Sequence, residues 1–202
     1  LALMSNQKMI GRARTLRFIP FREDLLESQY GSLTDSFHRN ALEDIQTDDV
    51  LVIDAGSCLD AAVLGDMFTR RVSQQGGTGI VIDGVLRDLT DIKTVGLPVF
   101  ARGMHGAGIT RALMSVGRDE PISCGGIPVI PGDVVVGDSD GVVVIPAQEA
   151  AELAEHSYDH ELEEVWIREK LGEGESLHEV YPPDQKWRPI LDAWKAAKKS
   201  SF

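Results

Sequence analysis

The first half of the chain consists mainly of short apolar runs. Turns and segments with helical periodicity lie between them. Strands are predicted at 9–18, 50–54, 79–82 and 98–101, and helices at 61–73 and 90–95. Three of these strands are β-branched or apolar runs typical of buried strands, whereas the first alternates partly, as half-buried strands do. Residues 55–57 (A-G-S) are expected to turn the chain. The order strand, helix, strand, helix, strand predicts at least one parallel βαβ unit.

Valine-rich segments and one long helical stretch fill the second half. Residues 127–145 contain short valine runs separated by P-G-D and D-S-D-G turns, which predicts a hairpin. A long helix is expected to begin at Pro146 and to run to about residue 171. We therefore predict an α/β fold with one domain over 1–171. Residues 172–202 form a tail whose two tryptophans pack on its own core or on a neighbouring subunit.

Composition narrows the class of protein. The chain has 202 residues, of which 43% are hydrophobic and 26% charged, as in ordinary globular proteins. Its formal net charge of -12 repels phosphate backbones and argues against a nucleic-acid partner. Cys58 and Cys124 are far apart, so reduced thiols in a cytoplasmic protein are expected. No apolar run approaches the ~20 residues of a membrane span, so no membrane partner is expected. The chain does not begin with Met, which leaves its native N-terminus open.

Charged residues follow the strand at 79–82 directly after an Asp-Gly turn. They are Arg87, Asp88 and Asp91. Arginine can bind a carboxylate through two parallel hydrogen bonds, and aspartate is a hard oxygen ligand for Mg²⁺ or Mn²⁺. These residues alone are equally compatible with a structural Arg–Asp ion pair that orders a loop.

Gly65 lies inside the helical pattern of 61–73, where glycine is unfavourable. Either the helix begins near Gly65, or Gly65 allows a close approach of the backbone, or the helix tolerates one glycine. If the helix begins there, the free N–H groups near Gly65, Asp66, Met67 and Phe68 form a seat for an anion. Asp66 precedes Asp88 by 22 residues, so a helix and a returning parallel strand can bring both carboxylates to one edge of the sheet.

Other motifs carry less weight. No G-x-G-x-x-G follows a strand, and neither a P-loop nor a G-x-S-x-G elbow is present. His156 and His160 have a zinc-like spacing, but Ser157 stands where H-E-x-x-H requires Glu, so a solvated helix face is favoured. His105 lies in a glycine-rich loop and is interpreted as a loop residue.

Six segments together resemble a known superfamily, that of the regulator of ribonuclease activity A and the 4-hydroxy-4-methyl-2-oxoglutarate aldolases. They are G-R-A-R-T at 11–15, D-V-L-V-I-D-A-G at 49–56, G-D at 65–66, G-I-V-I-D-G-V-L-R-D at 79–88, P-V-F-A-R-G at 98–103 and P-G-D-V-V-V-G-D-S-D-G-V-V-V-I-P at 131–146. The resemblance covers residues 9–171. It implies a layered α/β sandwich like the swivelling phosphohistidine domain, with a mixed central sheet, flanking helices and a C-terminal helical extension.

The superfamily contains metal-dependent pyruvate aldolases and non-catalytic regulators that bind a ribonuclease. An acid three residues after the Asp of Arg-Asp is typical of the aldolases, and Asp91 stands there. The resemblance therefore implies a lyase that cleaves 4-hydroxy-2-oxo acids of the 4-hydroxy-4-methyl-2-oxoglutarate type and decarboxylates oxaloacetate. It also implies a homotrimer or a dimer of trimers with sites between subunits. The regulator remains the alternative.

The resemblance assigns roles to individual residues. Arg87 and Asp88 are the implied catalytic residues, and Asp88 binds Mg²⁺ or Mn²⁺ directly. Asp66 and a glutamate from a neighbouring subunit, Glu163 or else Glu164, hold the metal through water. The amides of Gly65, Asp66, Met67 and Phe68, together with Arg87, bind the pyruvyl end of the substrate, and Asp91 supports the site.

Overall fold

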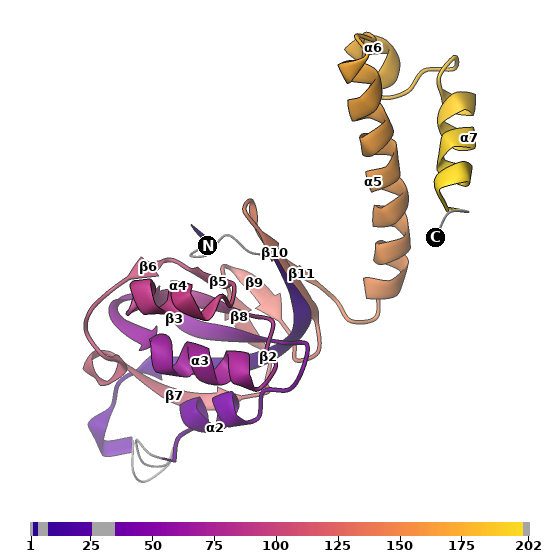
Figure 1. Cartoon of the computed structure of the whole chain (residues 1–202). Helices are drawn as coiled ribbons and strands as arrows, with labels where there is room; N and C mark the ends of the chain where they lie inside the picture. The colour runs from indigo at the N-terminus through magenta and orange to yellow at the C-terminus, as the bar shows by residue number, and fades with distance from the viewer. Residues whose placement is uncertain (1, 4–7, 26–34, 200–202) are drawn as a thin grey trace. The chain divides into compact units, whose positions relative to one another are not determined.

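A mixed β-sheet forms the centre of the N-terminal part of the chain in the computed structural model (Figure 1). The structure describes residues 2–3, 8–25 and 35–199. Neighbouring strands follow the order β1-β5-β4-β3-β2-β10-β11, with β6 beside β4 and β7 beside β2. The strands are β1 (Ala2–Leu3), β2 (Met9–Pro20), β3 (Asp49–Leu64), β4 (Gly79–Leu86), β5 (Val99–Ala101), β6 (Gly103–Met104), β7 (Leu113–Arg118), β10 (Val134–Asp138) and β11 (Gly141–Ile145).

The chain divides into two compact units, Leu1–Ala147 and Gln148–Phe202. The first unit also contains a two-stranded sheet and the shorter helices: β8 (Ile122–Cys124), β9 (Ile127–Val129), α2 (Phe37–Glu43), α3 (Asp66–Gln74), α4 (Leu89–Val95) and the 3₁₀ helix η1 (Ile109–Arg111). The second unit contains α5 (Ala150–Gly172), α6 (Leu177–Val180) and α7 (Arg188–Lys199). The sequence analysis assigned the long helix to the first domain, whereas its contacts group it with the C-terminal helices.

Parallel pairing organises the sheet. Strands β2, β3, β4 and β5 are parallel to one another, whereas β10 pairs antiparallel with both β2 and β11. The helices α3 and α4 connect β3 to β4 and β4 to β5, which confirms the expected βαβ connections. The hairpin predicted from the valine-rich segment is β10–β11. The predicted mixed α/β sandwich with C-terminal helices is therefore confirmed.

The two faces of the sheet have separate apolar cores, because side chains along a strand alternate between faces. One core joins the sheet to α2, α3 and α4, which lie together on one side of it in Figure 1. It includes Leu51, Ile53, Ile80 and Ile82. The other core contains the strand residues that alternate with those of the first core, and it packs against β8 and β9. It includes Val50, Val52, Val81 and Val129. The central strands are buried on both faces, as their continuous apolar runs predicted.

The predicted helix over 61–73 is wrong in its first part. Ala61–Leu64 belongs to β3, which pairs with β4 through a series of register shifts as far as Leu64. The predicted turn at 55–57 falls within the same strand, at its irregular part, where Gly56 and Ser57 have positive φ. An Ala-Ala-Val-Leu run suits a buried strand and a buried helix equally, so pairing with β4 decided between them.

A buried carboxylate joins β4 to the irregular part of β3. Asp83 pairs with Arg102 and accepts hydrogen bonds from Ser57 Oγ at 3.1 Å and Gly125 N at 2.9 Å. Burial raises the pKa of Asp83, but the hydrogen bonds from Arg102, Gly125 and Ser57 outweigh it, so the pKa lies below its ordinary value. The ionised carboxylate therefore stabilises the fold above the ordinary pKa of about 4.

Asp83→Asn is expected to lower the free energy of unfolding at pH 7 by about 2 kcal/mol, because Arg102 loses its charged partner. A carboxylate with a lowered pKa contributes fully above its unfolded pKa, and the contribution disappears as the pH falls through the folded pKa. The deficit should therefore shrink below about pH 4. Urea unfolding of both proteins from pH 7 to pH 3.5 measures this, and a deficit that is constant across the range contradicts it.

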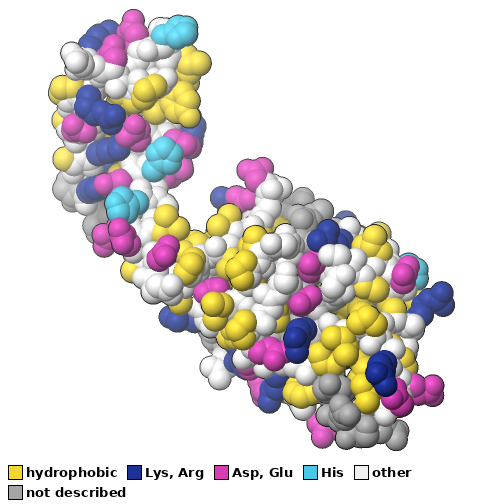
Figure 2. Space-filling view, turned by 180° about the vertical axis from the view of Figure 1, so that it is seen from behind, with side chains coloured by type: hydrophobic (Ala, Val, Ile, Leu, Met, Phe, Trp, Pro, Cys, Tyr) yellow, Lys and Arg dark blue, Asp and Glu magenta, His cyan; other side chains and the backbone are white. Residues whose placement is uncertain are grey.

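Exposed hydrophobic side chains lie on the surface of the first unit. They include Ile10, Met67, Met104 and Val143, each more than half exposed in the single chain. Figure 2 shows hydrophobic side chains gathered on one face of this unit among scattered charges of both signs. Exposed apolar patches of this kind are typical of surfaces that contact another protein.

The C-terminal unit has its own small core. Trp166 and Ile167 of α5 pack with Val180, Trp187 and Leu191, and the Trp166 and Trp187 rings meet edge to face with centroids 5.5 Å apart. The tail therefore contacts α5 of its own chain. Among the described helices, none combines the length and the apolar composition required to cross a membrane.

Candidate functional site

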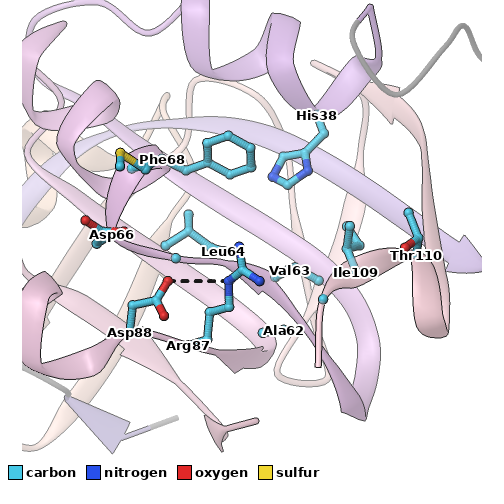
Figure 3. Close-up of a pocket in the computed structure, with 13 residues that line it drawn as sticks. His38, Ala62, Val63, Leu64, Asp66, Phe68, Arg87, Asp88, Ile109 and Thr110 are labelled. Carbon is cyan, nitrogen blue, oxygen red and sulfur yellow. Dashed lines mark ion pairs between the residues drawn. The ribbon is translucent and has the colours of Figure 1, made fainter. Parts of the chain in front are cut away.

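A cavity of about 240 Å³ lies where β3 and β4 end (Figure 3). These parallel strands are in register at Leu64 and Leu86, and Arg87 N donates to Leu64 O at 3.0 Å. The residues that follow each strand are therefore neighbours. The cavity is lined by His38, Ala62, Val63, Leu64, Gly65, Asp66, Met67, Phe68, Arg87, Asp88, Gly108, Ile109 and Thr110. The resemblance assigned six residues of one chain to the metal or to the pyruvyl end of the substrate. All six line this cavity.

Asp88 has an unusual backbone. Its φ of 60° and ψ of 35° are left-handed, a conformation that costs energy for a residue other than glycine and is best tolerated by Asn and Asp. Asp88 precedes α4, yet its side chain makes no capping hydrogen bond to that helix. Oδ2 lies 3.4 Å from Arg87 Nε, and both side chains are partly exposed. Within the described residues, this ion pair leaves the carboxylate available to a ligand.

Gly65 permits the close approach of Asp88. A Cβ atom built on Gly65 lies 2.5 Å from Asp88 Oδ2, closer than real Cβ atoms come, and 3.1 Å from Arg87 Nε, which is tight. The φ of Gly65 is -136°, which any residue can adopt, so space and not backbone conformation favours glycine here. The carboxylate of Asp88 therefore lies against the backbone at the start of α3.

The helix α3 begins at Asp66, so the interpretation of Gly65 as the start of a helix is confirmed. Gly65 provides no side-chain cap, and its carbonyl accepts the first helical hydrogen bond from Thr69 N at 3.1 Å. The N–H groups of Asp66, Met67 and Phe68 consequently have no partner within the helix. Since these residues line the cavity, the helix start and Arg87 together favour an anionic group.

The number and type of the side chains in the cavity decide whether they suit the metal that the resemblance implies. Asp66 and Asp88 both line the cavity, and among the described residues no three His, Cys, Asp or Glu side chains gather as a ligand cluster. Zinc sites need three or four side-chain ligands, whereas Mg²⁺ is often held by one or two carboxylates together with water and substrate oxygens. The carboxylate of Asp88 lies close to the backbone of Gly65, at the start of α3. The residues present therefore fit Mg²⁺ or Mn²⁺.

Two other expected site residues lie outside the lining of this cavity. Asp91 is exposed on the first turn of α4, where its N–H donates to Asp88 O at 3.0 Å and helps to begin the helix. Glu163 lies on α5 in the second unit, where Lys195 Nζ is 2.8 Å and Arg188 Nη1 is 3.3 Å away. The hydrogen bond from Lys195 and the neighbouring cations lower the pKa of Glu163. Glu163 is thus ionised and paired within its own unit, and its role toward a metal stays a prediction.

Sequence reasoning missed His38, which comes from α2 and lines the same cavity. The residue is 6% exposed, and its ring lies edge-on to Phe18 and Phe68, with centroid distances of 5.2 Å and 4.7 Å. Burial lowers the pKa of His38 to about 4, and the charge of Arg39 adds to this effect. The spacing of His38, Ala41 and Leu42 along one helix face was the signal that could have indicated its burial.

The buried histidine makes stability depend on pH. The unfolded chain binds a proton at His38 below its ordinary pKa of 6.5, whereas the folded chain does so only below about 4. Folding is therefore weakened as the pH falls through this window, by about 3 kcal/mol in total. His38→Leu should remove this part of the pH dependence. Urea unfolding of wild type and His38→Leu at pH 7 and pH 4.5 measures this pH dependence. If both proteins lose the same stability between these pH values, the dependence does not come from His38.

The geometry defines an α/β protein with a small polar site at the ends of two parallel strands. The RraA-like family, described as Aldolase/RraA, matches residues 1–144, and the chain belongs to this family. It is 35% identical over 145 residues to a protein of Halalkalibacterium halodurans named "Putative 4-hydroxy-4-methyl-2-oxoglutarate aldolase", covering 71% of this chain and 62% of the relative. It is 27% identical to protein DlpA of Legionella pneumophila subsp. pneumophila, covering 93% of this chain and 30% of DlpA.

A solved structure has the same fold. The crystal structure of Streptomyces coelicolor RraAS2, described as an unusual member of the RNase ES inhibitor RraA protein family, superposes with a TM-score of 0.72 at 36% identity. The match covers 81% of this chain and 77% of that chain. The chain spans less than two thirds of the length of both curated relatives named above.

Proposed function

We propose that the protein is a divalent-metal-dependent lyase that cleaves 4-hydroxy-2-oxo acids to pyruvate, and that it also decarboxylates oxaloacetate. The observation that carries this proposal is the contact between Gly65 and Asp88, which joins a helix start, an arginine and a carboxylate in one cavity. The similarity to a relative named for 4-hydroxy-4-methyl-2-oxoglutarate aldolase makes that compound the first substrate to test.

The start of α3 binds the carboxylate of the substrate. The N–H groups of Asp66, Met67 and Phe68 have no helical partners and donate to the anionic pyruvyl end. Asp88 would hold Mg²⁺ or Mn²⁺, and Asp66, which lines the same cavity, would assist. When bound, such a cation supplies a Lewis acid that neutralises charge developing on the 2-oxo group.

Arg87 stabilises the negative charge that develops during cleavage. The C4 hydroxyl of the substrate gives its proton to water, the C3–C4 bond breaks, and the electron pair of that bond forms the enolate of pyruvate. C4 leaves as a carbonyl, and protonation of the enolate carbon yields pyruvate. The guanidinium of Arg87 is fixed beside Asp88 and donates to the oxyanion, which favours the transition state over the ground state. Loss of CO₂ from oxaloacetate passes through the same enolate.

A homotrimer or a dimer of trimers is the proposed assembly, with Glu163 of a neighbouring subunit completing the metal site through water. The exposed hydrophobic side chains of the first unit support contact with another protein (Figure 2). Glu163 is ionised, as this role requires, although Lys195 and Arg188 hold it within its own unit. Glu164 is the next candidate on α5.

A second candidate function is a non-catalytic regulator that binds a ribonuclease. The similarity to RraAS2, whose family is described by inhibition of RNase ES, favours it. The net charge of -12 suits a basic partner. A regulator needs no free carboxylate in a cavity, so catalysis distinguishes the two candidates.

The test is release of pyruvate from 4-hydroxy-4-methyl-2-oxoglutarate and from oxaloacetate. Activity is expected with Mg²⁺ or Mn²⁺, is expected to disappear in EDTA, and should return when excess metal is added. Full activity in EDTA contradicts the metal mechanism. No pyruvate from either compound contradicts the lyase, and inhibition of a ribonuclease by the same preparation then supports the regulator.

A further inference from the structure

The cavity has a second wall opposite its charged end. Arg87 and Asp88 lie on one side, and in Figure 3 the ring of His38 points into the cavity from the other. Apolar side chains, among them Val63, Phe68 and Ile109, line the space between. A pyruvyl group bound at the helix start would direct the remainder of a longer substrate toward this second wall.

His38 carries an unused hydrogen-bonding atom. Its Nε2 is buried and has no hydrogen-bond partner among the residues that the structure describes. Buried polar atoms in native proteins nearly always have a partner, so an exception of this kind points to a missing ligand. The edge-on contacts with Phe18 and Phe68 restrict the ring, and the backbone N–H of His38 donates to Ser115 Oγ at 3.2 Å, which anchors the start of α2. The ring is therefore held in position by aromatic contacts that do not use Nε2.

The surroundings of His38 favour an uncharged ligand group. Burial keeps the imidazole neutral at pH 7 by lowering its pKa to about 4, so it provides one donor or acceptor and no positive charge. Among the described residues that line the cavity, the cation is Arg87, which lies at the other end beside Asp88. A carboxylate placed against His38 would lose its hydration without gaining a charged partner from the described residues that line the cavity.

We propose that His38 is the specificity-determining residue of this cavity: its Nε2 hydrogen-bonds a neutral polar group on the part of the substrate that leaves. The cavity then favours 4-hydroxy-2-oxo acids that release an uncharged aldehyde or ketone over those that release a second 2-oxo acid. The inference rests on the proposed function for its substrate class. The hydrogen bond itself can be tested without any reaction.

Binding of two unreactive analogues in the presence of Mg²⁺ tests the hydrogen bond. 2,4-Dioxopentanoate and 2-oxopentanoate differ only in the oxygen on C4. Calorimetry should show the dioxo compound binding about tenfold more tightly to the wild type, and this preference should disappear in His38→Leu. His38→Gln, whose amide can still hydrogen-bond, should restore part of it. The ¹⁵N chemical shift of the His38 ring should change with the dioxo compound only.

His105→Leu is the matched control, because His105 is exposed and does not line the cavity. It should keep the wild-type preference. An equal preference in wild type and in folded His38→Leu overturns the proposal, and so does failure of the wild type to bind either analogue. Urea unfolding establishes that each variant is folded before binding is compared.

Kinetics separate this inference from the proposed function. The wild type should cleave 4-hydroxy-2-oxopentanoate, which releases acetaldehyde, with a kcat/KM about tenfold above that for 4-hydroxy-4-methyl-2-oxoglutarate. His38→Leu should lose this preference in kcat/KM. Its rate of oxaloacetate decarboxylation should stay within about twofold of the wild-type rate, since oxaloacetate is too short to extend to His38. A wild type that favours the dicarboxylate overturns the inference alone. Absence of pyruvate from every compound contradicts the lyase, and calorimetry then decides on His38.

Discussion

Asp88→Asn is expected to reduce metal-dependent pyruvate release on the order of a thousandfold, for both 4-hydroxy-4-methyl-2-oxoglutarate and oxaloacetate. The amide has the shape of the carboxylate but no charge, so it cannot hold the cation that the reaction requires. Asparagine also tolerates the left-handed backbone of residue 88, so the fold should be retained. Steady-state kinetics with saturating Mg²⁺ measure the effect, and thermal unfolding confirms that the protein is folded.

Asp60→Asn is the matched control for this change. Asp60 is an exposed aspartate of β3 that does not line the cavity, and its variant should keep wild-type activity. Comparable rates for wild type and Asp88→Asn would remove Asp88 from the mechanism. Equal losses in Asp60→Asn and Asp88→Asn would indicate a general effect of charge instead of a metal ligand.

Gly65→Ala should lower activity on the order of a hundredfold although it adds one methyl group, because a small displacement of a reacting group carries a large cost. The new Cβ would lie 2.5 Å from Asp88 Oδ2, so the carboxylate must move away from the helix start. Alanine can adopt the backbone conformation of Gly65, so the stability of the fold should change little. Kinetics and urea unfolding on the same preparation separate the two effects.

Gly106→Ala is the control for the added methyl group. Nothing lies within 4 Å of a Cβ built there, and Gly106 does not line the cavity. This variant should behave as the wild type in both measurements. A Gly65→Ala protein with normal activity would show that the close contact with Asp88 is dispensable, and would contradict the geometry on which the proposed function rests.

The meeting of Asp66 with Asp88 at one edge of the sheet was predicted from sequence, because a helix and a returning parallel strand separate them, and both line the cavity. The buried strands themselves were recognisable as apolar runs. The start of α3 was not decided in advance, since Ala61–Leu64 suits a strand and a helix equally. Only pairing with β4 extends the strand to Leu64.

His38 could not be identified as a cavity residue from its own neighbourhood. Its burial depends on Phe18 and Phe68, which come from β2 and α3 and are distant in the sequence. The ion pairs of Glu163 have a similar origin, because Lys195 follows it by 32 residues and reaches it only through the packing of α7 on α5. The periodicity of a helix indicates which of its faces is buried, but not which distant residues pack against that face.

Diffraction from crystals soaked with Mn²⁺ and oxalate, a stable mimic of the pyruvate enolate, tests the central claim most directly. The anomalous signal should show one Mn²⁺ bound to the Asp88 carboxylate, with oxalate between the cation, the first N–H groups of α3 and Arg87. Asp88→Asn crystals should lack the peak. A peak elsewhere, or oxalate bound identically in both proteins without metal, would contradict the account.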